Sequence, residues 1–171
     1  MKSFTFDIRT KIVGLFVIFI LLFIGFVFLW VFPRTKQVVM TQKQEQLQCL
    51  VQNVVSLLKD YQKDEQQGKL TREEAQQRAL QRIKDLRYGP EGKDYFWIND
   101  FGPKMIMHPF RPDLDGKDLG DFKDPHGKAL FVEFSKTCRD KGAGFVEYMW
   151  QWKDDKSRIV PKLSYAQAFA P

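Results

Sequence analysis

The sequence predicts an α+β domain with an antiparallel sheet, preceded by one transmembrane helix. Three observations support this prediction: an uncharged apolar run near the N-terminus, two amphipathic helical patterns after it, and later aromatic or β-branched runs separated by turn residues. With 171 residues, of which 44% are hydrophobic, the chain has the size of one ordinary domain and not the composition of a disordered protein.

The composition also excludes several classes of function. The net charge of +6 arises from 27 basic and 21 acidic residues that alternate along the chain, whereas a nucleic-acid-binding surface requires clustered basic residues. Two cysteines, Cys49 and Cys138, are too few for a disulfide scaffold or a four-cysteine zinc site. We therefore expect neither a nucleic-acid partner nor a cofactor.

Residues 12–33 are predicted to form the transmembrane helix. The 21 residues from Ile12 to Phe32 carry no charge, and about 20 helical residues cross the bilayer core. Trp30 lies near the end of this run, where an aromatic ring suits the lipid–water interface. A cleaved signal peptide is the alternative, but its apolar region is typically only about 7–15 residues long and ends in small residues.

The flanking charges predict the orientation of this helix. Lys2, Arg9 and Lys11 precede it with only Asp7 opposing them, which favours a cytoplasmic segment at residues 1–11. Basic residues at positions 34 and 36 reduce the asymmetry. Residues 34–171 are then expected on the extracytoplasmic side.

Two amphipathic helices are expected next. The first ends before Gly68, and the second begins with a capping box formed by Thr71 and Glu74 and stops at Gly89. Cys49 lies on the polar side of the first helix, as a surface thiol or as half of a disulfide between two copies. The apolar positions are Leu47, Leu50, Val51, Val54, Leu58 and Tyr61 in the first helix and Ala75, Ala79, Ile83 and Leu86 in the second.

Residues 94–99 and 104–108 are predicted to form a hairpin around a loop at 100–103. A four-residue loop sets Asn99 opposite Lys104, so that Tyr95 faces His108 and Trp97 faces Ile106. One face of the hairpin then carries Tyr95, Trp97 and His108, and the other carries Phe96, Ile98, Met105 and Met107.

A long connection at residues 110–126 leads to a third helix at 127–141, with Phe131, Phe134 and Cys138 on one side. Two strands follow at 145–152 and 159–169, joined by a polar turn. A five-residue turn sets Tyr148 opposite Lys162, and a six-residue turn puts the two on opposite faces. The sequence leaves both registers open.

The motifs of catalysis and metal binding are missing from the sequence. It has no catalytic serine turn, no phosphate-binding glycine loop and no HExxH motif, so we expect no enzyme and no catalytic residue. The aspartates from Asp113 to Asp124 lack the spacing of a calcium loop, and His108 and His126 are too far apart to suggest zinc. We therefore predict no metal site.

Two polar residues remain as candidates for ligand binding. His108 is either a buried histidine bonded to the main chain or a donor to an anionic or carbonyl ligand. Lys162 is either a solvent-facing lysine or a cation in a pocket.

Several short motifs resemble the type 2 single Cache domain, which is the extracytoplasmic sensor module of many bacterial methyl-accepting chemotaxis receptors and some sensor kinases. The likeness covers about residues 35–171, in order and in spacing. The motifs are DYFWIND at 94–100, MIMHP at 105–109, LDGK at 114–117, DPHGK at 124–128, GFVEY at 144–148 and PKLSYA at 161–166.

The resemblance implies a PAS-like antiparallel sheet with a long N-terminal helix, and a pocket for a short carboxylate such as acetate, propionate, pyruvate or lactate. It further implies a single-pass protein of the bacterial inner membrane that forms a homodimer, needs another polypeptide for its output, and serves chemotaxis or another signalling pathway. The implied ligand-binding residues are Tyr95, Trp97, His108, Tyr148, Lys162 and Tyr165.

Members of this family continue after the position of Pro171 into a further strand, a second transmembrane helix and cytoplasmic signalling regions. The resemblance therefore implies that residues 34–171 are a Cache domain without its final strand. The alternatives for its function are a membrane-tethered dimerisation module that senses nothing, or the input domain of a sensor kinase or cyclase.

Overall fold

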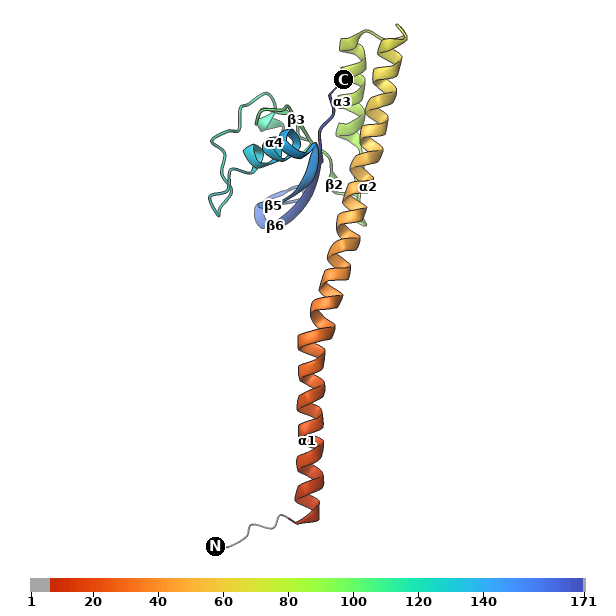
Figure 1. Cartoon of the computed structure of the whole chain (residues 1–171). Coiled ribbons are helices and arrows are strands. Elements are labelled where there is room, and N and C mark those ends of the chain that lie inside the picture. The colour runs from red at the N-terminus through yellow and green to blue at the C-terminus, as the bar shows by residue number, and fades with distance from the viewer. Residues whose placement is uncertain (1–6, 171) are drawn as a thin grey trace. The chain divides into compact units, whose positions relative to one another are not determined.

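The structure, a computed structural model, describes residues 7–170. The chain divides into two compact units, Met1–Glu45 and Gln46–Pro171 (Figure 1). Helix α2 (Phe32–Gln66) contributes residues to both units. Each unit is described separately below.

The first unit is helical and apolar. Helix α1 (Ile8–Phe26) begins at Asp7, whose side chain accepts a hydrogen bond from the Ile8 N–H, and the π-type segment η1 (Val27–Val31) links it to α2. Pro33 lies just after the π-type segment, inside a helix that continues from Ile8 to Gln66, and its lack of an N–H removes one bond from the helical ladder there. This helical stretch is the one segment of residues 7–170 that is long and apolar enough to cross a membrane. The helix continues past Pro33 as far as Gln66.

The second unit begins with the amphipathic part of α2 and continues into α3 (Arg72–Asp85). The predicted capping box is present: the Thr71 hydroxyl accepts from the Glu74 N–H, and the Glu74 carboxylate accepts from the Thr71 N–H. Ala75, Ala79 and Ile83 are buried along α3. The helical periodicity thus identified the inward face of α3.

Four short strands follow: β1 (Arg87–Tyr88), β2 (Asp94–Tyr95), β3 (Ile98–Asn99) and β4 (Met105–Met107). They form two antiparallel pairs, β1 with β2 and β3 with β4.

The predicted register of the β3–β4 hairpin is wrong. Asn99 pairs with Met105 and not with Lys104, Ile98 pairs with Met107, and a bulge interrupts the ladder between them. An extra residue in a bulge changes which side chains share a face. Met105 joins the main core, whereas Ile98 lines a groove beside α2 and α3. The expectation that Ile98 and Met105 share a face is therefore also wrong.

The connection after β4 contains the short helix η2 (Pro112–Leu114) and leads to α4 (Leu130–Lys141). The Asp124 carboxylate organises its last part by accepting the N–H groups of His126, Lys128 and Met149 at 2.9 Å each. Because Met149 lies in β5 (Ala143–Trp152), this side chain ties the connection to the following strand.

Strands β5 and β6 (Asp155–Gln167) form a long antiparallel hairpin. Tyr148 pairs with Lys162, as one of the two open registers required. The tight turn has only Lys153 and Asp154 between the strands, and a bulge beside Trp152 restores this register. Strand β6 therefore begins at Asp155, four residues before the predicted start.

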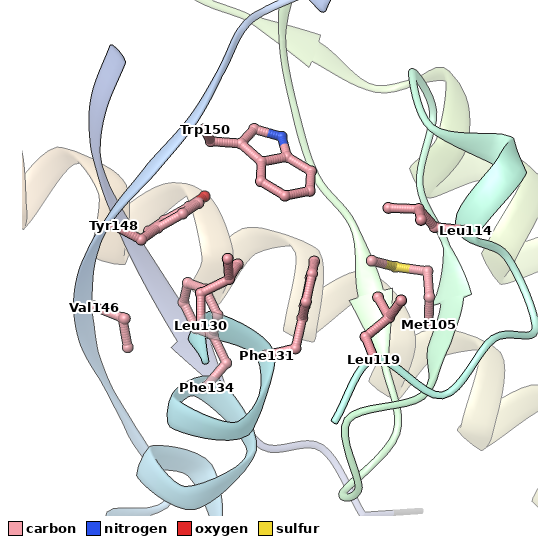
Figure 2. Close-up of a cluster of buried hydrophobic side chains, with 9 residues drawn as sticks. All are labelled: Met105, Leu114, Leu119, Leu130, Phe131, Phe134, Val146, Tyr148 and Trp150. Carbon is pink, nitrogen blue, oxygen red and sulfur yellow. The ribbon is translucent and has the colours of Figure 1, made fainter. Parts of the chain in front are cut away.

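The main core lies between α4, β4 and β5 (Figure 2). Figure 2 shows aromatic rings of α4 and β5 meeting aliphatic side chains of β4 and of the connection after it. Phe131 and Phe134 are almost fully buried, and the Phe131 ring lies edge-on to Trp150 at 5.6 Å between centroids. The nine buried residues are Met105, Leu114, Leu119, Leu130, Phe131, Phe134, Val146, Tyr148 and Trp150.

Replacing Phe131 by alanine is expected to lower the free energy of unfolding by about 3–5 kcal/mol, because it leaves a cavity in this core. The measurement is urea unfolding of the full chain in detergent micelles, followed by tryptophan fluorescence. Phe101→Ala is the matched control, since Phe101 is exposed. Equal losses in the two variants would contradict the assignment of this core.

Candidate functional site

The side chain of Tyr95 lies at the centre of a buried polar cluster. Its hydroxyl accepts a hydrogen bond from Trp150 Nε1 at 3.0 Å and one from Lys162 Nζ at 3.2 Å. The Lys162 ammonium also lies 4.2 Å from the centroid of the Tyr95 ring. β2 supplies Tyr95, and β5 and β6 supply Trp150 and Lys162, so the cluster joins β2 to a hairpin with which it shares no ladder.

His108 lies directly after β4 and is 2% exposed. Its Nδ1 accepts the N–H groups of Phe110 at 3.2 Å and Arg111 at 3.0 Å, and its ring centroid is 4.8 Å from that of Tyr95. An imidazole nitrogen that accepts hydrogen bonds carries no proton, so in the neutral ring the hydrogen is on Nε2. The turn after Pro109 thereby sets His108 as a donor through Nε2.

The electrostatics of the cluster follow from burial. Burial, aided by the nearby charges of Lys162 and Arg111, lowers the pKa of His108 to about 3, so the ring is neutral near pH 7. Burial also lowers the pKa of Lys162 to about 8. Lys162 has no carboxylate within ion-pair distance among residues 7–170. The site thus holds an ammonium without an ion-pair partner.

Tyr148 lies beside this cluster on the same face of the hairpin as Lys162. Its hydroxyl is hydrogen-bonded to Ser164 Oγ at 3.0 Å, and burial raises the pKa of Tyr148 well above its usual range. Both tyrosines of the cluster therefore remain protonated, and neither supplies a negative charge to balance Lys162.

The hydrogen-bond inventory of the cluster shows an excess of donors. The Tyr95 hydroxyl uses its two lone pairs on Trp150 and Lys162, which leaves its own hydrogen to donate. Within residues 7–170 no acceptor pairs with that hydrogen or with His108 Nε2–H, and Lys162 retains further hydrogens. Donors next to an unpaired cation favour a compact anion with several acceptor atoms.

Two residues that the sequence analysis did not single out help to build this site. Trp150 follows Tyr148 by two positions, so the period of a strand places it on the same face, and this signal was available. Arg111 lies in the turn after His108, and its guanidinium carbon is 5.9 Å from the centroid of the Trp150 ring. No periodic pattern in the connection could have placed Arg111 there.

The other two predicted ligand residues lie elsewhere. Trp97 packs edge-on against Phe134 at 5.2 Å between centroids, and Tyr165 packs against Phe145 at 4.8 Å. Tyr165 is three positions from Lys162 in β6, so the alternation of a strand puts it on the opposite face. The structure therefore brings together Tyr95, His108, Tyr148 and Lys162, and leaves Trp97 and Tyr165 outside their polar cluster.

Trp97, Tyr165 and one side of Tyr95 line an apolar groove with a volume of about 470 Å³. The remaining walls of this groove come mainly from α2, α3 and the end of β6. Its lining includes no acidic or basic residue other than Glu65 and Asp100. The groove and the polar cluster thus meet at Tyr95 but differ in chemistry.

Metal binding has no structural support in the part of the chain that is described. Residues 7–170 contain no cluster of three or more His, Cys, Asp or Glu side chains that could hold an ion. Cys49 is exposed, as predicted, and Cys138 is half-buried.

Comparison with known proteins agrees with this geometry. Residues 39–171 match the sequence profile of single Cache domain 2. The chain belongs to the single Cache domain 2 family. The resemblance seen in the short motifs is thereby confirmed over most of the chain.

Two characterised relatives are sensory proteins. The chain is 48% identical over 129 residues to the methyl-accepting chemotaxis protein McpP of Pseudomonas putida. The aligned region covers 75% of this chain and 23% of McpP. It is also 32% identical over 93 residues to the sensor histidine kinase MctS of Rhizobium johnstonii. This second aligned region covers 54% of this chain and 19% of MctS. The chain thus matches about a fifth to a quarter of the length of these relatives.

Solved Cache structures share the fold. A periplasmic sensor domain of a chemotaxis protein is 37% identical with a TM-score of 0.71, and the match covers 76% of this chain and 88% of that domain. A Cache chemosensory domain solved to explain carboxylic acid recognition is 44% identical with a TM-score of 0.72, and the match covers 78% of this chain and 88% of that domain. This chain therefore has the Cache sensor fold, with its long N-terminal helix and antiparallel strands.

The buried neutral His108 predicts a dependence of stability on pH. Its pKa is about 3 in the folded state against an ordinary value of 6.5, so below pH 6.5 the unfolded chain binds the proton more readily. The free energy of unfolding should then decrease as the pH is lowered from about 6.5 to 5. The decrease should be roughly 1.4 kcal/mol per pH unit once His108 is protonated in the unfolded state.

Urea unfolding of the full chain in detergent, repeated across this pH range, measures the effect. His108→Gln should remove most of the slope, whereas His126→Gln, the matched control, should retain it. Equal slopes in the protein and in His108→Gln would contradict the burial of a neutral His108.

Proposed function

We propose that this chain is the membrane-anchored sensor domain of a bacterial signalling protein and binds a short carboxylate between Lys162, His108 and Tyr95. The observation that carries the proposal is the excess of donors around an ammonium that has no ion-pair partner. A carboxylate supplies the missing negative charge and has two oxygens to accept from these donors. Binding by such groups requires no catalytic step.

The surroundings favour a short ligand. Rings of Tyr95, Phe110 and Trp150 surround the donors, with centroids of Tyr95 and Phe110 only 5.0 Å apart. A small alkyl group can pack against such rings while its carboxylate reaches the polar atoms. The related chemosensory domain that recognises carboxylic acids supports this choice of ligand class.

We also propose the orientation in the membrane that the sequence predicts. Residues 1–11 would lie in the cytoplasm, residues 12–33 would span the inner membrane, and residues 34–171 would form the extracytoplasmic sensor. The exposed apolar side chains of α1 and the periplasmic location of a related sensor domain support this arrangement.

A further strand would complete the domain if it lay in the apolar groove next to β6. Among the described residues β6 pairs only with β5, so its other backbone edge is unpaired. The buried Gln167 Oε1 in the groove wall accepts no hydrogen bond from the described residues. An extended segment would supply N–H groups and apolar side chains for this groove.

Replacing Lys162 by methionine should weaken acetate binding at least about tenfold, because it removes the charge but keeps the length of the side chain. Calorimetry on the full chain in nanodiscs, alone and extended by the homologous next segment of McpP, measures this effect. Lys104→Met is the matched control, since Lys104 is exposed in the β3–β4 loop. Unchanged affinity in Lys162→Met would contradict the proposed site.

The affinity for acetate should also depend on pH. Lys162 has a pKa of about 8 in the free protein, and only its protonated form pairs with a carboxylate. Affinity should therefore be constant up to about pH 7.5 and then fall by up to tenfold per pH unit, until the raised pKa of the complex is reached. The same titration in Lys104→Met should show an equal fall, and a flat profile would contradict the role of Lys162.

The second candidate is a dimerisation module that senses nothing, and the exposed Cys49 on α2 favours it. In that case no carboxylate should raise the melting temperature of the full or extended chain. A disulfide-linked dimer through Cys49 on non-reducing gels would persist in Lys162→Met and His108→Ala.

A further inference from the structure

A second cation lies next to the proposed site, but it has a partner. The Arg111 guanidinium donates from Nε to both oxygens of Asp113, at 2.9 and 3.1 Å, and from Nη2 to Oδ2 at 2.7 Å. Such a two-pronged contact is among the strongest pairings that arginine makes. It holds the pKa of Asp113 far below its usual range and raises that of Arg111.

Asp113 also contacts a second cation. Lys156, at the start of β6, lies 3.4 Å from Asp113 Oδ1. The aspartate thus bridges the connection that carries Arg111 and the hairpin that carries Lys162. Its side chain is 46% exposed, so the bridge lies at the rim of the site and not in the core.

Arg111 and Lys162 differ in what they can offer a ligand. Both approach the hydrogen-bonded pair of Tyr95 and Trp150: Lys162 through the Tyr95 hydroxyl and Arg111 beside the Trp150 ring. Lys162 has no carboxylate partner, whereas the charge of Arg111 is balanced by Asp113. Of the three cations at the site, Arg111, Lys156 and Lys162, only Lys162 has no carboxylate within ion-pair distance among residues 7–170.

We infer that Asp113 makes this site selective for monocarboxylates over dicarboxylates, by occupying the arginine that would bind a second carboxylate. The inference rests on the proposed function, since it concerns the ligand of that same site. A ligand with one carboxylate pairs with Lys162 and leaves the arginine–aspartate pair intact. A second carboxylate on the ligand would meet Asp113, which repels it and blocks Arg111.

The physical reason is a cost that the ligand cannot recover. To reach Arg111, a dicarboxylate must displace Asp113 and so exchange one carboxylate contact for another. The second carboxylate gives up its hydration for no net gain in ion pairs. Rejection by an unfavourable charge contact is a common source of specificity in binding sites.

The test compares acetate with malonate, which is acetate carrying a second carboxylate. Asp113→Asn removes the counter-charge with little change in shape, and Asp121→Asn is the matched control because Asp121 is an exposed aspartate of the same connection. Dissociation constants are measured by calorimetry on the full and extended chains in nanodiscs. Monomethyl malonate, which is larger than malonate but carries one charge, separates the effect of charge from that of size.

The ratio of malonate affinity to acetate affinity should rise about tenfold or more in Asp113→Asn and stay unchanged in Asp121→Asn. The ratio for monomethyl malonate to acetate should not rise. The double variant Asp113→Asn with Arg111→Gln should lose the gain, because the freed guanidinium is its source. Asp113→Ser provides the same comparison if the asparagine variant does not fold.

An unchanged malonate ratio in a folded Asp113 variant that still binds acetate would overturn the inference alone. A gain in Asp113→Asn that persists in the double variant would also overturn it. If neither the full chain nor the extended chain, both without substitutions, binds acetate or another monocarboxylate, the proposed function fails and this inference fails with it.

Discussion

The hydrogen bonds of the Tyr95 hydroxyl hold together the strands of the second unit, which contains the candidate site. The hydroxyl accepts hydrogen bonds from Trp150 in β5 and Lys162 in β6. The backbone ladders of this unit join strands only in pairs, so β2 is held to the β5–β6 hairpin by side chains. A buried polar contact of this kind is specific, since an arrangement without it would leave the buried indole N–H of Trp150 unpaired.

The same contact explains why the site holds an unfavourable charge. Burial disfavours the ammonium of Lys162, and the protein offers it a hydroxyl and an aromatic ring in place of a carboxylate. His108 adds no second positive charge because its ring is neutral, with Nδ1 occupied by two backbone N–H groups. The proposed carboxylate would relieve this cost on entering the site, so its binding would raise local stability.

The connection between β4 and α4 is attached to the β5–β6 hairpin at two points. Asp124 ties its end to Met149 in β5, and Asp113 ties its start to Lys156 in β6. Arg111 lies two residues before Asp113 and contributes one of the two backbone N–H groups that orient His108. The long polar loop therefore acts as part of the site, although it contains little regular structure.

Local rules were sufficient for the helices. The period of apolar residues located α2 and α3, and the capping box at Thr71 marked the start of α3, because both signals act within a few residues. The hairpin registers were harder, since one inserted residue reverses the faces of a strand. The bulge in the β3–β4 ladder moved Met105 into the core, and the bulge near Trp152 set the pairing of Tyr148 with Lys162.

By itself, the sequence determined the apolar N-terminal segment, the amphipathic helices α2 and α3, the family, and four residues that meet in the polar cluster, since these follow from composition, periodicity and short motifs. Only the tertiary structure decided that Tyr148 lies opposite Lys162, that Trp150 shares the Tyr95 hydroxyl, and that Asp113 pairs with Arg111. These facts depend on bulges and on a loop without a repeating pattern. Contacts between residues far apart in the chain settle such features, and no local sequence signal encodes them.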